Sequence, residues 1–335
     1  MRTTSLSRRG LLAAGTAALA APALGQTAAP AFPEALERAR GFDQIRSLIV
    51  SVGGETRLAR AIRGPATDQI VNVKSVSKSI VSALVGIAID RGALDGPDQR
   101  IAPLLRADLP PDPDPRLDRI TLGDLLSMRA GLERTSGGNY GAWVSSGNWV
   151  RDALARPFDA DPGGRMLYST GNFHLLGAIL TQVTGRSLLD LSRDWLGRPL
   201  GIDIAPWVRD PQGLYLGGND MGVSAEGLLR FGEMYRQGGT WQGNRVLSQD
   251  WIDASWQARA RSPYSGDAYG YGWFLRKMGG EEVAYARGYG GQAIWVVPGA
   301  ALTVVVTSDP NRPARSEGYM GALHAMVEDA ILPAV

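Results

Sequence analysis

The sequence predicts an α+β fold in which an antiparallel sheet is flanked by helices and interrupted by a mainly helical lobe. Strand-like runs lie early in the chain, between residues 47 and 62, and again late, between 269 and 307. Apolar residues between these two regions recur at helical spacing. Strands that are close together in a chain pair antiparallel. We therefore expect an α/β lobe over residues 26–95 and 265–335 and an inserted lobe over 96–264.

The first 25 residues predict an export signal. Basic residues Arg2, Arg8 and Arg9 precede the apolar run Leu11 to Leu24, which ends among small residues at Gly25. The run is shorter than the roughly 20 apolar residues that span a bilayer, so we expect no permanent membrane anchor. The arginine pair resembles a twin-arginine signal. A signal peptide over 1–25 and a periplasmic or secreted location follow as expectations.

Composition narrows the function classes. The chain has 335 residues, no cysteine, two histidines and a formal net charge of +2. Without cysteine, stability must come from a hydrophobic core, and a transition-metal site lacks its usual ligands. No basic stripe indicates nucleic-acid binding. We expect no cofactor or metal, a small-molecule substrate and no nucleic-acid partner; the sequence does not specify the oligomeric state.

The stretch from Val73 to Ile80 carries the first chemical motif. Apolar spacing and the helix-ending Gly92 predict a buried helix over about 75–90. On that helix Ser75 and Lys78 lie three residues apart and share one face. A serine hydroxyl needs a base, and a lysine can act as one only when its pKa falls well below about 10.4. Burial at a helix amino end lowers the pKa of an ammonium.

A second motif begins at Tyr168, just ahead of an apolar helix expected over 173–183. A phenol near a lysine can relay a proton, whereas the competing interpretation is a tyrosine that only packs its ring. The segment 137–147, rich in glycine and asparagine, predicts a binding loop that contains Tyr140 and Trp143. The flexible segment 217–222 could wall a pocket.

Other elements follow from start and stop signals. Thr121, Ser224 and Ser248 are expected to cap helices, because each precedes a helical segment. The late strands and the final helix are expected at 269–276, 282–287, 293–297, 302–307 and 314–332.

Taken in order, Ser75 with Lys78, Tyr168, and the turn from Ala286 to Gln292 resemble the serine beta-lactamase and penicillin-binding superfamily. The chain is most similar to its class C beta-lactamase-related branch, which includes esterases and the 6-aminohexanoate-dimer hydrolase. The stretch 125–132 contributes to a likeness that covers nearly the whole mature chain. The resemblance implies a beta-lactamase/transpeptidase-like fold with a site between two lobes.

The resemblance also implies roles for individual residues. Ser75 would be the acylated nucleophile, Lys78 its base and Tyr168 the partner in proton transfer. Backbone N–H groups of Ser75 and Tyr289 would form an oxyanion hole. Substrate contacts are expected from the following residues: Tyr140, Thr170, Gly288 and Gly290.

Two departures from the lactamase pattern bear on the substrate. Thr170 stands where lactamases have an asparagine, and Ala286 stands where they have a lysine. In lactamases these groups handle the amide and the carboxylate of the antibiotic. Arg287 could supply a cation, but alternation along a strand directs it to the other face of the sheet. A small ester or a linear amide is therefore the expected substrate.

Rival functions remain open. A Ser/His/Asp hydrolase would need His174 or His324, yet both lie in predicted helices where a packing role is expected, and no G-x-S-x-G motif occurs. A beta-lactamase, a D-alanyl peptidase and a non-catalytic binding module are three further rivals. The prediction is an exported serine hydrolase that acts through a Ser75 acyl-enzyme.

Overall fold

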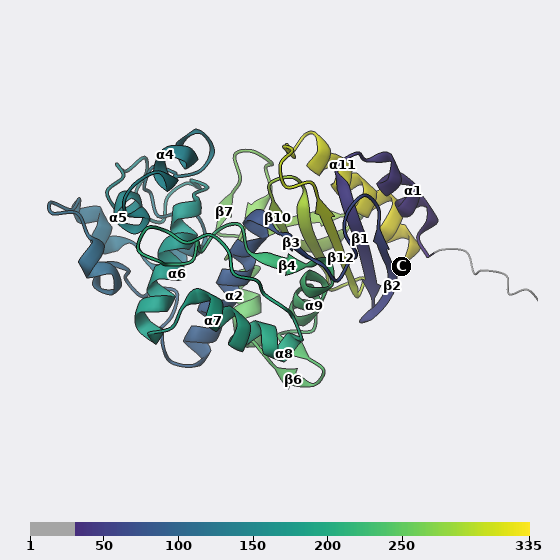
Figure 1. Ribbon diagram of the computed structural model, residues 1–335, viewed down its shortest axis with the longest axis horizontal. Coiled ribbons are helices and arrows are strands. Elements are labelled where there is room, and N and C mark those ends of the chain that lie inside the picture. The colour runs from purple at the N-terminus through teal and green to yellow at the C-terminus, as the bar shows by residue number, and fades with distance from the viewer. Residues whose placement is uncertain (1–30) are drawn as a thin grey trace, which may run out of the picture. The chain divides into compact units, whose positions relative to one another are not determined.

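An eight-stranded antiparallel sheet organises the computed structural model, which describes residues 31–335 (Figure 1). Its strand order is β2-β1-β12-β11-β10-β9-β8-β7. The strands are β1 (Ile45–Val52), β2 (Glu55–Ala61), β7 (Ala260–Arg261), β8 (Ala268–Tyr269), β9 (Phe274–Met278), β10 (Glu281–Gly288), β11 (Gln292–Val297) and β12 (Leu302–Ser308). The predicted signal peptide over 1–25 lies outside the described residues.

The early and late strands share this one sheet, as expected. β1 pairs antiparallel with β12, with Leu48 opposite Val306, and it pairs with β2 on its other side. Every residue of β11 and β12 is buried. Strands covered on both faces consist mainly of apolar residues, which explains the continuous valine-rich runs. The α+β fold class is confirmed.

Helices cover both faces of the sheet and build the rest of the unit (Figure 1). They are α1 (Pro33–Gly41), α2 (Ser77–Asp90), α3 (Leu122–Leu126), α4 (Tyr140–Val144), α5 (Trp149–Leu154), α6 (Thr170–Thr184), α7 (Leu188–Ser192), α8 (Arg198–Leu200), α9 (Ala225–Arg236), α10 (Gln249–Ser255) and α11 (Tyr319–Met326). On one face, Gly232 of α9 lies against the side chains of Ile294 and Thr303. On the other, His324 of α11 accepts a hydrogen bond of 3.1 Å from Trp295.

The predicted helix caps are confirmed. The Thr121 hydroxyl accepts from the Asp124 N–H, and the Asp124 carboxylate accepts from the Thr121 N–H, which is a complete capping box. The hydroxyls of Ser224 and Ser248 cap α9 and α10 by accepting from the N–H groups of Gly227 and Trp251. Side-chain oxygens thus satisfy N–H groups that a helix leaves without partners.

Three element boundaries differ from the prediction. The strand expected over 269–276 is two strands, because a turn at Gly272, with a φ of 80°, separates β8 from β9. The final helix begins at Tyr319 rather than at 314, since Pro313 and Gly318 interrupt a helical start. The expected binding loop over 137–147 contains α4, whose Trp143 is fully buried.

A short strand pair fixes the approach to α2. β3 (Ile70–Asn72) pairs with β4 (Gly222–Ser224) and so joins the segment before α2 to the segment before α9. Residues 31–335 form one compact unit, and the lobe boundaries at 95 and 265 stay predictions. Within the described residues, no helix is long and apolar enough to cross a membrane.

Candidate active site

Ser75 and Lys78 meet at the start of α2. Ser75 lies in a 3-10 turn (η1, Lys74–Val76) that runs directly into the helix, and Lys78 belongs to the first helical turn. The Lys78 Nζ lies 2.9 Å from the Ser75 Oγ. The predicted spacing therefore brings hydroxyl and amine within hydrogen-bond distance.

Lys78 is buried among neutral oxygen atoms. The residue is 1% exposed, and its Nζ donates to the Gly218 carbonyl at 2.6 Å and to the Thr170 hydroxyl at 3.3 Å. Burial lowers the pKa of Lys78 from 10.5 to about 7, and the Asp220 charge opposes this shift. Near neutral pH a substantial share of this amine is uncharged and can accept a proton.

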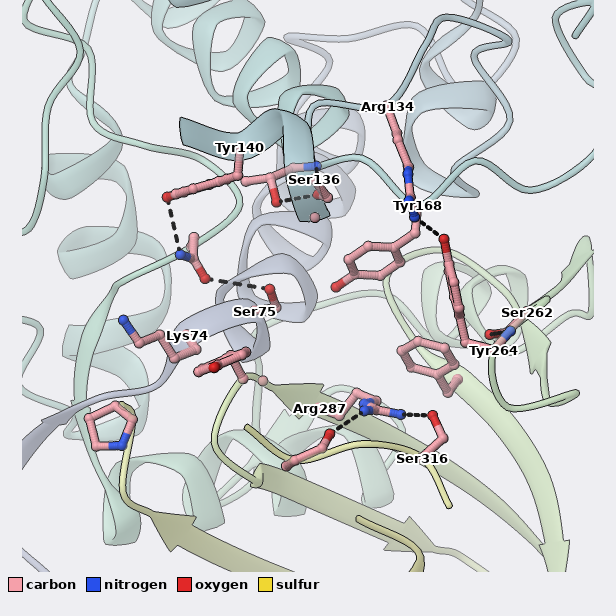
Figure 2. Close-up of a pocket in the computed structure, with 18 of the residues that line it drawn as sticks. Lys74, Ser75, Arg134, Ser136, Tyr140, Tyr168, Ser262, Tyr264, Arg287 and Ser316 are labelled. Carbon is pink, nitrogen blue, oxygen red and sulfur yellow. Dashed lines mark hydrogen bonds between the residues drawn. The ribbon is translucent and has the colours of Figure 1, made fainter. Parts of the chain in front are cut away.

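Tyr168 stands on the other side of the same pair. It precedes α6, and its ring centroid lies 5.1 Å from the Lys78 Nζ. Burial raises the pKa of the Tyr168 phenol, while the neighbouring Ser75 hydroxyl and the charge of Arg287 have smaller opposing effects. The phenol therefore keeps its proton at neutral pH and can donate it. Figure 2 shows its ring beside Ser75.

Thr170 connects the base to a second hydroxyl. Its Oγ1 lies 2.9 Å from the Ser136 Oγ, and the Ser136 Oγ accepts a hydrogen bond of 2.8 Å from the Thr170 N–H. Thr170 thus contacts Lys78 and lines the cavity described below, at the position where lactamases carry an asparagine. The contribution of Ser136 was not predicted from sequence.

The end of β10 approaches the nucleophile closely. A Cβ added at Gly288 would lie 2.6 Å from the Val73 carbonyl oxygen and 3.0 Å from the Ser75 nitrogen, so only glycine fits there. Tyr289 follows; it is 53% exposed and lines the cavity. The Gly288 backbone, next to the predicted oxyanion-hole residue Tyr289, therefore lies against the backbone of Ser75.

Gly290, a predicted substrate contact, lies in the turn between β10 and β11. It is not among the residues that line the cavity, and its φ of 86° serves the turn between β10 and β11. A Cβ there would meet the Asp309 carbonyl oxygen at 2.2 Å. The glycine is therefore required by backbone conformation and packing.

Ser75, Tyr168 and Thr170 border a cavity of about 640 Å³ (Figure 2). It is lined by Lys74, Ser75, Arg134, Ser136, Gly137, Tyr140, Tyr168, Thr170, Asn219, Ser262, Tyr264, Phe274, Arg287, Gly288, Tyr289, Pro310, Asn311, Ala314 and Ser316. None of these described residues is acidic. Across the cavity, Arg134 donates a hydrogen bond to the Tyr264 hydroxyl. The predicted contact residue Tyr140 is present and accepts from the Asn219 amide at 3.4 Å.

Arg287 also borders the cavity, which the sequence did not predict. As predicted, Arg287 and Ala286 lie on opposite faces of the sheet. Arg287 shares with Tyr285 the face that α11 covers, where Tyr285 packs against His324. However, the pairing of β9 with β10 reaches only Tyr285, so the end of β10 has a free edge around which the cavity extends. The guanidinium donates to the Ser316 hydroxyl at 2.9 Å and to the Ala314 carbonyl at 3.0 Å. Both partners are neutral.

The two histidines are packed away from Ser75. His174 Nε2 lies 3.1 Å from Asp210 Oδ2, and both side chains are fully buried. His324 accepts from Trp295. Neither histidine lines the cavity, so neither is placed to activate Ser75. Among residues 31–335 no cluster of His, Cys, Asp and Glu could hold a metal ion.

Comparisons with known sequences identify the family of the chain. The chain matches the Beta-lactamase family over residues 44–327. It is 24% identical over 288 residues to the 6-aminohexanoate-dimer hydrolase of Paenarthrobacter ureafaciens, covering 78% of this chain and 72% of that protein. It is 34% identical over 125 residues, 36% of this chain, to a Dichelobacter nodosus protein described as "Probable fimbrial assembly protein FimD, serogroup H1", of which it spans only 31%.

Solved structures show the same fold. EstCE1, a hydrolase with promiscuous acyltransferase activity, aligns with a TM-score of 0.73 at 20% identity, over 90% of this chain and 99% of that one. A family VIII carboxylesterase aligns with a TM-score of 0.72 at 16% identity, over 92% and 98%. At these identities the likeness concerns the fold alone.

Proposed function

Since the chain belongs to the beta-lactamase family of serine hydrolases, we propose that it cleaves a small ester or amide through an acyl-enzyme on Ser75. The observation that carries this proposal is the buried Lys78 amine, which lies 2.9 Å from the Ser75 hydroxyl and donates to neutral oxygens of Gly218 and Thr170. A serine next to a base whose pKa lies near 7 has the activation that nucleophilic catalysis needs.

The hydrogen bonds of Lys78 support its role as the base. A neutral amine has two N–H groups and one lone pair. The Gly218 carbonyl and the Thr170 hydroxyl can take the two N–H groups, which leaves the lone pair for the Ser75 proton. After proton transfer, the resulting ammonium has three N–H groups for the same three oxygens. The site therefore holds both protonation states without a large rearrangement.

Tyr168 completes the proton path. Its raised pKa keeps the phenol protonated, so Tyr168 is placed to give a proton to the leaving group while Lys78 takes the one from Ser75. The reverse path activates the water that releases the acyl group. Backbone N–H groups of Ser75 and Tyr289 would stabilise the oxyanion, each typically worth about 2.7 to 4 kcal/mol of barrier.

The altered motifs favour an ester or a linear amide over a beta-lactam. Thr170 offers a hydroxyl in place of the asparagine amide, and Ala286, at 1% exposure, offers no cation. A beta-lactamase, a D-alanyl peptidase and a non-catalytic binding module are the outcomes that the following experiment separates from this proposal.

The test is pre-steady-state hydrolysis of p-nitrophenyl butyrate by the purified mature protein. A burst of nitrophenol near one equivalent is expected, and Ser75→Ala should abolish it. Ser145→Ala, which removes an exposed hydroxyl, serves as the matched control and should leave the burst unchanged. Turnover retained in Ser75→Ala would overturn the assignment. Absence of both a burst and steady turnover with ester, amide and beta-lactam probes alike would indicate a binding module.

We also infer export from the leader sequence. The basic residues and apolar run before Gly25 support a twin-arginine route to the periplasm or beyond. Cell fractionation after Arg8→Lys/Arg9→Lys should show loss of the exported protein. Unchanged export of that variant would contradict the twin-arginine route.

A further inference from the structure

An ion pair lies directly beside the nucleophile. Lys74 precedes Ser75, and its Nζ lies 2.8 Å from the Asp220 carboxylate. The two side chains are only 20% and 15% exposed, so the pair is largely shielded from solvent. Partly buried charges interact more strongly than charges on an open surface. The pair therefore affects the electrostatics of the site.

Both members of this pair adopt unusual backbone conformations. Lys74 has a φ of 49° and Asp220 a φ of 65°, which is the left-handed region that residues with a Cβ seldom occupy. Such strain persists where the surroundings enforce it, and it gathers at functional sites. Here the enforcing contacts include the bond from the Val73 N–H to the Met221 carbonyl at 3.0 Å. The ion pair thus joins the segment of the nucleophile to the segment 217–222.

The second segment serves the catalytic groups directly. Gly218 supplies the carbonyl that accepts from Lys78, and the Asn219 side-chain carbonyl oxygen lies 3.4 Å from the Ser75 hydroxyl oxygen. Asp220 holds this segment in place through further hydrogen bonds, accepting from the Asn72 amide at 2.8 Å and from the Asn219 amide at 3.1 Å. Asp220 is therefore built into the structure of the site.

The negative charge of Asp220 opposes the role of Lys78 as a base. Its carboxylate acts on Lys78 by attraction and so favours the ammonium, which cannot accept the Ser75 proton. The other titratable or charged groups around Lys78 are the Tyr168 phenol, which is neutral, Lys74, and Arg287, whose charge acts on Tyr168. Among these, Lys74 is the cation in direct contact with the carboxylate.

We propose that Lys74 is a positioning residue whose ion pair with Asp220 cancels the carboxylate charge that acts on Lys78, and thereby keeps Lys78 unprotonated for the acylation step. This inference rests on the proposed function, because it concerns the base of that same reaction. It adds a second lysine that acts on the first through Asp220 and touches no reacting atom.

The test is the pH dependence of kcat/KM for p-nitrophenyl butyrate in charge variants of the pair. Lys74→Met leaves the Asp220 charge without its counter-ion. The acid limb of the profile, which is the rise of kcat/KM as Lys78 loses its proton, should therefore shift to a pH about one unit higher. Asp220→Asn leaves Lys74 uncompensated and should move the limb down. The double variant should return the limb close to its wild-type position, and Lys74→Arg, which keeps the charge, should leave it in place.

A purely structural role gives a different pattern. Loss of kcat/KM in Lys74→Met with no displacement of the limb would overturn the inference, and so would shifts of the same sign in Lys74→Met and Asp220→Asn. If Lys74→Met alone does not fold, the double variant decides the question. A Lys74 without influence on Lys78 would leave the profile of the double variant where Asp220→Asn puts it, whereas the inference predicts a return toward wild type. The Ser75→Ala burst separates the two failures, because it tests the acyl-enzyme independently of Lys74.

Discussion

Lys78 and His174 are equally buried ionisable residues, at 1% and 0% exposure, yet their surroundings differ. Lys78 contacts hydroxyl and carbonyl oxygens, whereas His174 contacts the Asp210 carboxylate at 3.1 Å. A buried ammonium that contacts no carboxylate directly gives up its proton more readily, whereas a buried ring that hydrogen-bonds to a carboxylate is held in place. The partners, and not the burial, thus separate a reactive group from a structural one.

The location of the two residues agrees with this difference. Lys78 lies behind a serine that opens into a cavity of about 640 Å³. His174 is enclosed by the rings of Trp143 and Trp149, with ring centroids 5.7 and 5.6 Å away, and the Asp210 carboxylate also accepts from the Leu214 N–H. His174 therefore fixes the segment around Asp210 against α6.

Lys78→Met tests the reactive side of the comparison and has the largest expected effect. Losing the base should lower kcat/KM about 10³-fold. Because the folded pKa of Lys78 is lowered from 10.5 to about 7, the folded state binds fewer protons than the unfolded state between these values. The amine therefore costs stability at neutral pH, and the variant should melt no lower than wild type at pH 7. A variant that is active, or inactive because it is unstable, would contradict this.

His174→Leu tests the structural side. The change keeps roughly the same volume but removes the ring nitrogen beside Asp210 Oδ2, and loss of this buried contact with a carboxylate is expected to cost about 3 kcal/mol of unfolding free energy. His324→Leu is the matched control, since His324 is also buried but only accepts from an indole N–H, a loss of about 1 to 3 kcal/mol. Denaturant unfolding measures both. An equal loss of unfolding free energy in the two variants would show that the Asp210 carboxylate does not distinguish His174 from His324.

The pH profile of the wild-type enzyme tests whether Lys78 is the base. Protonated Lys78 cannot accept the Ser75 proton, so kcat/KM should rise with pH and level off above about 7. Below that pH, each unit should lower kcat/KM about tenfold. A profile that still rises between pH 8 and 10 would show that the base is a group with an ordinary lysine or tyrosine pKa.

Arg287 is a third charged residue, at the wall of the cavity. Its substitution is expected to have the smallest effect on kcat/KM. Its hydrogen-bond partners are neutral, so the guanidinium can pair with an anionic substrate group. Arg287→Gln should therefore lower kcat/KM for p-nitrophenyl hydrogen glutarate about tenfold relative to the neutral p-nitrophenyl butyrate. An equal change for both esters would place Arg287 outside substrate recognition.

Local patterns predicted much of the fold and the centre of the site. Helical spacing after Ser75 brought Lys78 onto its face, and the sheet followed from strand runs that are close in sequence. The surrounding groups were not predictable in this way. Asn219 and Asp220 reach the site through the β3–β4 pairing, and Ser316 reaches it because the final helix begins late. The position of Arg287 at the cavity could be predicted only by knowing that β9 stops pairing at Tyr285.

The central claim is that Ser75 carries the acyl group, and peptide mass mapping tests it most directly. The enzyme is mixed with p-nitrophenyl butyrate, quenched in acid during the burst and digested. A butyryl mass increase is expected on the peptide that contains Ser75, and it should be absent from the same peptide of Ser75→Ala. A burst with the acyl group on another residue, or with no acylated peptide, would contradict it.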